Sequence, residues 1–236
     1  LGFQNAGFDK VASFEIDKDA SATIEKNFKN SIHFKDDIKQ VTNRKLSKIF
    51  GKKKIDIICG GPPCQGFSVA GYRNPDDKRN LLFREYLRFL KFFKPKIFML
   101  ENVPGILTMS DGNVKDIMMS EFEKLGYNNT SVRILESANF EVPQLRTRAI
   151  FIGNRLGKKN PYPKIINTKE NYLNIEDYID DLKNHPRDPS INHEWTKHSE
   201  KFEKRISKVK PGQSLYEGFR DAYKRQYLGF PSMAVK

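Results

Sequence analysis

The chain has 236 residues, enough for one sizeable hydrophobic core and a smaller appendage. Its 42 lysines and arginines exceed its 29 aspartates and glutamates, and the formal charge of +13 favours a polyanionic partner. An AT-rich genome would also enrich lysine, so charge alone leaves both explanations open. No apolar run is long enough to cross a membrane, and no signal peptide is visible. Two cysteines are too few for a disulfide framework or a zinc site, so we expect a reducing, cytoplasmic setting and no metal.

The first predicted elements along the chain are the end of a helix and two strands. Leu1 to Gly7 is typical of the second half of a helix that ends at a glycine. In a dinucleotide-type fold, a strand and a glycine-rich turn precede such a helix, so we expect a segment outside this sequence. Residues 11–17 predict the next strand, ending in carboxylates that can bind a ribose diol. A helix over 21–27 and a short strand with its turn over 33–38 follow.

A rigid loop carries one of the two cysteines. Ile55 to Cys59 is a short apolar run that predicts a buried strand, which two glycines and two prolines end abruptly. Cys64 therefore follows the carboxyl end of a predicted strand, where ligands bind in open α/β sheets. A free cysteine is more often a small buried thiol, and Cys59, inside the apolar run, is the better candidate for that role.

A second predicted strand ends in polar side chains. Residues 96–100 form an apolar run, and Glu101 and Asn102 follow it. If this strand and the one before Cys64 are parallel neighbours, the carboxylate and the amide lie at the same sheet edge as the thiol.

Two arginines precede another apolar run, at residues 149–153. Arg146 and Arg148 alternate with Thr147, so as strand residues they would share one face. A thiol, a carboxylate and paired guanidinium groups in three loops indicate a nucleophilic site with an acid and an anion stabiliser.

The remaining elements are two helices, a strand pair and a polar region. An apolar stripe predicts a core-facing helix over 80–93, and a second helix over 115–125 ends before a glycine. Residues 131–136 and 148–152 predict strands, as an antiparallel pair. Beyond a linker rich in glycine, proline and lysine (157–164), we expect an acidic helix over 175–182, a basic one over 199–209, and aromatic and cationic side chains interleaved at 223–227 as on DNA-contacting surfaces.

Three motifs occur together in a characteristic order. They are Gly-Pro-Pro-Cys-Gln-Gly-Phe-Ser at 61–68, Glu-Asn-Val at 101–103 and Gln-x-Arg-x-Arg at 144–148. With them the chain resembles the bacterial cytosine-5 DNA methyltransferase family, most closely over residues 1–155. The resemblance implies an α/β, doubly wound, Rossmann-like S-adenosylmethionine-dependent methyltransferase fold. Residues 1–155 would form the catalytic cofactor-binding domain, and residues 156–236 a linker and an incomplete target-recognition region.

The resemblance also implies how the residues act. Methyl transfer to carbon 5 of a cytosine flipped out of double-stranded DNA would use Cys64 as the nucleophile at carbon 6. Glu101 would bind nitrogen 3, and Arg148 would stabilise the carbonyl oxygen at carbon 2. Arg146, close to the thiol, and Asn102 would hold the loops. The other implied substrate-binding or loop-supporting residues are Gln65, Ser68 and Gln144.

The implied cofactor is S-adenosylmethionine. Its implied binding residues are Glu15, Ile16, Asp37, Ile38, Pro63 and Leu82. Glu15 would bind the ribose, Asp37 the adenine amino group, and Ile16 and Ile38 would pack on the ring. Asp36 stands where the family frequently has glycine, so the choice between the two neighbouring acids stays open. The resemblance further implies a monomer in a restriction-modification system, with a restriction endonuclease as its counterpart.

Three alternatives remain. A cysteine hydrolase would need a histidine base, but the four histidines lie outside the strand-end loops. An RNA-directed relative would share the mechanism, although its loop usually has Pro-Phe-Thr where this chain has Gly66-Phe67-Ser68. Because the family's first motif and last segments are not visible, a catalytically incomplete DNA-binding fragment or one half of a split enzyme is also open.

Overall fold

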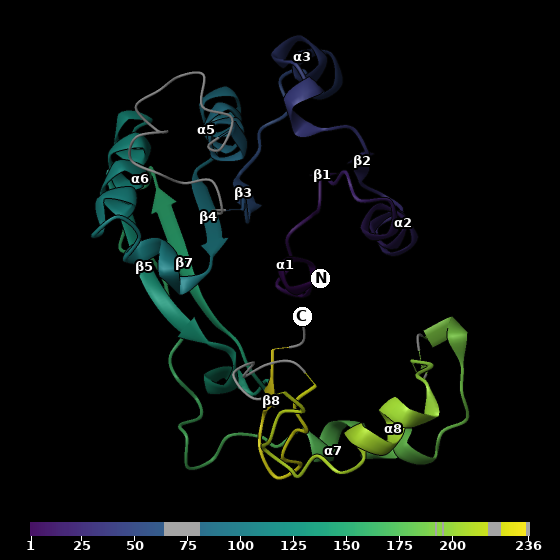
Figure 1. Ribbon diagram of the computed structural model, residues 1–236. Coiled ribbons are helices and arrows are strands. Elements are labelled where there is room, and N and C mark those ends of the chain that lie inside the picture. The colour runs from purple at the N-terminus through teal and green to yellow at the C-terminus, as the bar shows by residue number, and fades with distance from the viewer. Residues whose placement is uncertain (64–80, 192, 195, 217–222, 235–236) are drawn as a thin grey trace. The chain divides into compact units, whose positions relative to one another are not determined.

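The computed structural model describes residues 1–63, 81–191, 193–194, 196–216 and 223–234 (Figure 1). The chain forms two compact units, and its path passes between them more than once. The first unit holds residues 1–134 and 149–161, and the second holds 135–148 and 162–236. The boundary expected after Arg155 stays a prediction about independently folding domains.

The first unit begins with a small parallel sheet. Its strands are β1 (Ala12–Phe14) and β2 (Ile32–Phe34), which pair in parallel. The helices here are α1 (Gly2–Asn5), α2 (Lys18–Asn27) between the strands, the 3-10 turn η1 (Ile38–Gln40) and α3 (Asn43–Phe50). The Asp17 side chain caps α2 by accepting a hydrogen bond of 2.8 Å from the amide of Ala20, so the helix begins at Lys18, three residues before the predicted start.

A second sheet has four strands in the order β3-β4-β7-β5. They are β3 (Ile57–Gly60), β4 (Ile97–Asn102), β7 (Thr147–Asn154) and β5 (Asn129–Glu136). The predicted parallel pairing of β3 and β4 is confirmed, with Ile57 opposite Ile97 and Gly60 opposite Leu100. The predicted strands β5 and β7 are neighbours, and their arrows point in opposite directions in Figure 1.

Strand β4 is longer than the apolar run that predicted it. Glu101 and Asn102 continue the strand because antiparallel β7 extends the ladder, placing Ile150 and Ala149 opposite them. Side chains alternate between buried and half-buried along β4, so Glu101 and Asn102 point to opposite faces.

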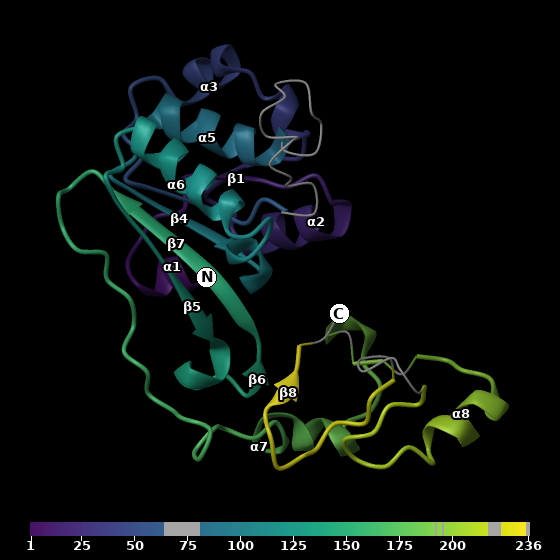
Figure 2. The same cartoon turned by 60° about the vertical axis from the view of Figure 1, so that its left-hand side comes forward.

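Helices α5 (Leu81–Phe93) and α6 (Asn113–Lys124) cover one face of this sheet (Figure 2). The stripe predicted on α5 packs into the core, with Phe83 and Leu90 fully buried against Phe98 of β4 and Phe122 of α6. The 3-10 turn η3 (Pro104–Leu107) follows β4. This core fixes the ends of β3 and β4 as a rigid platform.

A second cluster joins the small sheet to the other side of α5. Phe14 and Phe34 stack at 4.5 Å between ring centroids, and Phe89 of α5 meets Phe14 edge-on at 4.8 Å. Within the described residues the small sheet shares no strand pairing with the larger one. Side-chain packing therefore connects the two sheets.

The second unit is poorer in regular structure. It contains the 3-10 turn η4 (Ser137–Phe140), β6 (Gln144–Leu145), α7 (Glu176–Ile179), the turns η5 (Asp180–Asn184) and η6 (Pro189–Ile191), α8 (Glu200–Ile206) and β8 (Ser232–Met233). Strands β6 and β8 pair in parallel. Both predicted helices are shorter than expected, because neither α7 nor α8 buries a side chain and packing supplies most helix stability in proteins.

Candidate active site

Asn102 joins the ends of the two parallel strands. Its Nδ2 donates a hydrogen bond of 2.9 Å to the carbonyl oxygen of Pro62, and its Oδ1 accepts one of 2.9 Å from the amide of Val103. The Asn102 side chain is only 7% exposed, while its partners are less covered, with Pro62 half-buried and Val103 43% exposed. One amide therefore fixes the loop after β3 and the turn after β4.

Gly61 lies against the carboxylate of Glu101. A Cβ atom at Gly61 would be 3.0 Å from Oε2 of Glu101, closer than ordinary van der Waals contact. The neighbouring Gly60 faces the Tyr86 ring in the same way, at 3.1 Å. Sequence reasoning took these glycines only as the end of a strand. The sequence signal for a closely packed turn was the pair of glycines followed at once by two prolines.

The other end of this loop lies outside the described residues. Cys64, Gln65 and Ser68 all belong to that stretch, and Pro63 is the last described residue before it. The predicted roles of the three residues stay predictions.

Cys59 is exposed, so the prediction that it is a buried thiol is wrong. Its neighbours in β3 are half-buried, but its own side chain faces the cleft described next. Partial desolvation by the surrounding chain raises the pKa of Cys59, and the positive charge of Lys10 opposes this only in part. Cys59 is thus a protonated thiol at neutral pH and a weak nucleophile.

The first unit contains a cleft of about 1150 Å³ between β1 and β3. Its lining includes all six residues predicted to bind the cofactor, which are Glu15, Ile16, Asp37, Ile38, Pro63 and Leu82. Ile16 is 64% exposed and Leu82 is 37% exposed, so both present apolar surface to the cleft. The assignment of these residues to a cofactor stays a prediction.

The two strands of the small sheet are each followed by a carboxylate that lines the cleft, Glu15 after β1 and Asp37 after β2. Glu15 follows β1, and its Oε1 accepts the amide of Asp17 at 2.9 Å. Asp37 caps η1, and hydrogen bonds from the amide and the side chain of Lys39 lower the pKa of its carboxyl group. Asp36, the neighbouring acid, pairs with Lys45 at 2.6 Å instead. An ionised Asp37 can accept a hydrogen bond from an exocyclic amine.

The Gln-x-Arg-x-Arg segment lies in the second unit. The amide of Arg146 donates to Oε1 of Glu136 at 2.5 Å, and the Thr147 hydroxyl donates to Oε2 of the same residue at 2.5 Å. The carbonyl oxygen of Gln144 accepts the Ser137 hydroxyl at 2.5 Å. Sequence reasoning missed Glu136, because a lone acid eight residues before the motif carries no local signal.

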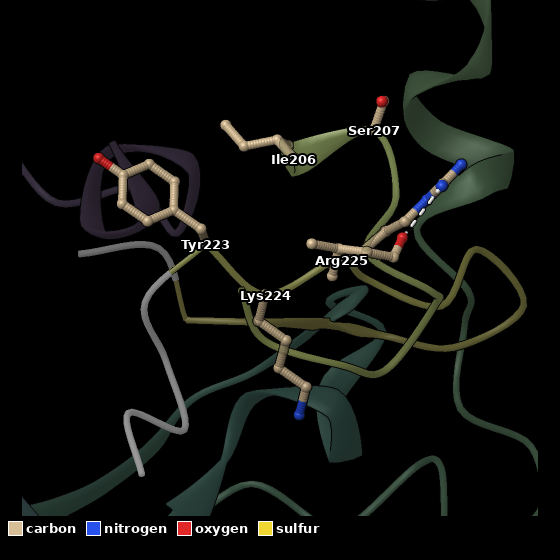
Figure 3. A pocket seen from close by; sticks show the side chains of 6 residues that line it. Ile206, Ser207, Tyr223, Lys224 and Arg225 are labelled. Atoms are coloured by element: carbon tan, nitrogen blue, oxygen red, sulfur yellow. Dashed lines mark hydrogen bonds between the residues drawn. The ribbon is translucent and has the colours of Figure 1, made fainter. Parts of the chain in front are cut away.

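A smaller pocket of about 390 Å³ lies beside α8 in the second unit (Figure 3). Nη1 of Arg225 donates to the carbonyl oxygen of Val209 at 3.2 Å, so that guanidinium group supports the loop. The Tyr223 ring meets Phe202 of α8 edge-on at 5.1 Å, and Lys224 points away from that ring. The surface thus combines cationic and aromatic groups, and its predicted contact with DNA stays a prediction.

The described residues contain neither a candidate membrane-spanning helix nor a candidate metal site. No helix there is long and apolar enough to cross a membrane. In the same part of the chain, no three histidine, cysteine or acidic side chains are close enough to hold a metal ion.

Curated relatives are type II methyltransferases. The chain is 35% identical over 216 residues to M1.HphI of Haemophilus parahaemolyticus, which covers 90% of this chain and 58% of the relative. It is 41% identical over 190 residues to M.FnuDI of Fusobacterium nucleatum, covering 78% of this chain and 52% of the relative. The chain therefore spans little more than half the length of these relatives.

Solved structures share the fold. A protein encoded within a prophage of E. coli, described as a DNA modification methyltransferase, matches with a TM-score of 0.66 at 22% identity, covering 97% of this chain and 76% of that one. The Dnmt2 methyltransferase of S. pombe matches with a TM-score of 0.58 at 18% identity, covering 100% of this chain and 72% of that one. The predicted Rossmann-like methyltransferase fold is confirmed. The family model of the C-5 cytosine-specific DNA methylases matches residues 1–232, and the chain belongs to this family.

Proposed function

We propose that this chain transfers a methyl group from S-adenosylmethionine to carbon 5 of cytosine in double-stranded DNA. One observation carries the proposal. Parallel β3 and β4 bring Glu101 against Gly61, three residues before Cys64, while Asn102 ties the same loop through Pro62. A carboxylate is thereby held beside the start of the loop that carries the thiol, as a nucleophile–acid pair requires.

The cleft of the first unit fits the cofactor. An acid after β1 suits a ribose diol, and the ionised carboxylate of Asp37 suits the adenine amino group. The exposed side chains of Ile16 and Leu82 offer apolar surface to a planar ring. When bound, the cofactor supplies an electrophilic methyl group.

The chain's own residues would activate the base. Carbon 5 of cytosine is a poor nucleophile, and addition of the Cys64 thiolate at carbon 6 makes it an enamine carbon. Glu101 would hydrogen-bond or protonate nitrogen 3 and so accept the developing charge. Arg148 would stabilise the oxygen at carbon 2. After carbon 5 has taken up the methyl group, loss of its proton to solvent and elimination of Cys64 would restore the aromatic ring and free the enzyme.

The relatives' names suggest the biological setting. They are type II methyltransferases, so we propose that the chain acts as a monomer in the cytoplasm, in a restriction-modification system with a counterpart endonuclease. The charge of +13 supports a polyanionic substrate. Gly66 to Ser68 favour DNA over RNA, because the RNA-directed relatives usually have Pro-Phe-Thr there.

The test is transfer of tritium from labelled S-adenosylmethionine to unmethylated genomic DNA. We expect Cys64→Ser to abolish transfer and to leave cofactor binding within about twofold, because the thiol acts on the base. Cys59→Ser is the control for loss of a thiol: Cys59 belongs to β3, outside the loop that carries Cys64, and we expect this variant to keep transferring methyl groups. A Cys64→Ser rate of a tenth or more, about 1.4 kcal/mol in barrier, would rule out the nucleophile assignment.

A second function remains because the chain spans 58% of its first relative. In that alternative it is a catalytically incomplete DNA-binding portion or one half of a split enzyme. Retention of DNA without methyl transfer by the wild-type chain would support it, and transfer by the isolated chain would reject it.

A further inference from the structure

The carboxylate of Glu136 engages two consecutive residues of the arginine segment. Glu136 is the last residue of β5, and the residues it holds follow ten and eleven positions later. Its Oε1 accepts the Arg146 amide at 2.5 Å, and its Oε2 accepts the Thr147 hydroxyl at 2.5 Å. Hydrogen bonds to an ionised carboxylate are about twice as strong as neutral ones, so this pair resists rotation of the segment.

The next residue, Ser137, adds two bonds to the same segment. Its amide donates to the carbonyl oxygen of Arg146 at 3.2 Å, and its hydroxyl donates to that of Gln144 at 2.5 Å. Strand β8, near the C-terminus, pairs in parallel with Gln144 and Leu145. The segment is thus held by its backbone on both sides.

The Thr147 contact determines which face the arginines occupy. Successive side chains of an extended segment point to opposite faces, so Thr147 on the Glu136 side places Arg146 and Arg148 on the other. Nη1 of Arg148 donates to the carbonyl oxygen of Thr147 at 2.8 Å, which further limits its guanidinium group. The Glu136 oxygens meanwhile accept the Arg146 amide, the Thr147 hydroxyl and, at 3.3 Å, the Ser137 hydroxyl, and none of these groups carries a charge.

We propose that Glu136 is a positioning residue that fixes the rotation of residues 144–148. It thereby presents the Arg146 and Arg148 side chains together to the anionic substrate, which is DNA in the function proposed above. The proposal rests on the function proposed above for these arginines. Glu136 itself makes no contact with substrate in this proposal. Loss of its carboxylate should make the two guanidinium groups more mobile while the second unit stays folded.

Four variants separate positioning from general stability. Glu136→Ala removes both acceptors, and Thr147→Val removes one hydroxyl while keeping size and strand propensity. In Glu136→Gln the amide oxygen can still accept the Arg146 amide, and the amide nitrogen can donate to Thr147. Glu123→Ala, at an exposed position on α6, is the control with the same change in charge.

The first readout is the order of the Arg146 and Arg148 Nε–H groups, from nitrogen-15 relaxation of the free chain. We expect order to fall in Glu136→Ala, to fall less in Thr147→Val, and to stay at the wild-type level in Glu136→Gln and Glu123→Ala. Unchanged order in a folded Glu136→Ala chain overturns the proposal. This readout needs no turnover, so it decides the matter even if the wild-type chain transfers no methyl group, a result that would count against the proposed function alone.

The second readout is methyl transfer. Loss of a positioned group costs about 100-fold, so we expect kcat to fall by about that factor in Glu136→Ala with the KM for the cofactor within about twofold. Rescue by Glu136→Gln supports positioning. A Glu136→Gln variant as slow as Glu136→Ala, with unfolding temperature and both KM values shifted equally in the two, overturns it.

Discussion

Replacing Asn102 by aspartate tests how the loop before Cys64 is held. Asn102→Asp keeps the shape of the side chain and the acceptor for the Val103 amide, but it puts an oxygen where Nδ2 now donates to Pro62 at 2.9 Å. The lost hydrogen bond is worth about 1 kcal/mol, and leaving the half-buried Pro62 carbonyl without its donor adds about 1–3 kcal/mol. With the side chain only 7% exposed, solvent does little to screen the new contact. We expect a loss of about 2–4 kcal/mol in the free energy of unfolding at pH 8.

The loss should depend on pH. Burial and the facing carbonyl favour the protonated form of the new carboxyl group, so its folded pKa lies above the unfolded value of about 3.9. The folded state then binds more protons between those two values, and stability relative to wild type falls as pH rises through that window. Below it, the protonated side chain donates to Pro62 and most of the loss is recovered.

Urea denaturation from pH 4 to pH 8 measures the effect, with wild type and Asn102→Ala at each pH. The alanine variant carries no titratable group, so its deficit should stay constant. A deficit of Asn102→Asp below about 0.5 kcal/mol at pH 8, the level of neutral surface substitutions, would refute the reasoning. So would a deficit with the same pH profile as that of alanine.

Three further outcomes follow from the first unit. Gly153→Ala would put a Cβ 2.1 Å from Cε1 of the buried Phe98 ring, so we expect a loss of about 3 kcal/mol in urea denaturation, whereas Gly105→Ala, with no atom within 4 Å, should be nearly neutral. Equal losses in both variants would contradict this. Lys94 ends α5 with φ of 48°, so Lys94→Gly should gain about 1 kcal/mol and Lys94→Ala, which keeps the Cβ, should gain nothing. Glu15→Ala should weaken S-adenosylmethionine binding about tenfold by calorimetry and leave DNA affinity within about twofold; the reverse pattern would refute its cofactor role.

Much of the candidate active site at the sheet edge was accessible from local sequence. Buried strands are short apolar runs, and Gly, Pro and charged residues directly after them mark the sheet edge, so β3, β4 and their loops could be found from consecutive residues. The parallel pairing that brings Glu101 toward the Cys64 loop followed from the same reading. These features need only the alternation of residue types along a few positions.

Contacts between distant positions were not accessible in this way. Glu101 and Asn102 belong to β4 because β7 pairs with them, and no local pattern encodes that ladder. Cys59 lies in an apolar run that predicts burial, yet the cleft beside β3 leaves it exposed. The short helices of the second unit bury no side chain, and such packing depends on distant segments that a local pattern does not contain.

Local sequence was enough to identify the family, the strand-end motifs and the chemistry expected of them, because each motif is a run of neighbouring residues. Three contacts became visible in the folded chain alone: Gly61 lies against Glu101, Asn102 bonds to Pro62, and Glu136 holds the arginine segment. Each of these contacts joins residues that are 10 or 40 positions apart, and folding alone brings such residues within bonding distance.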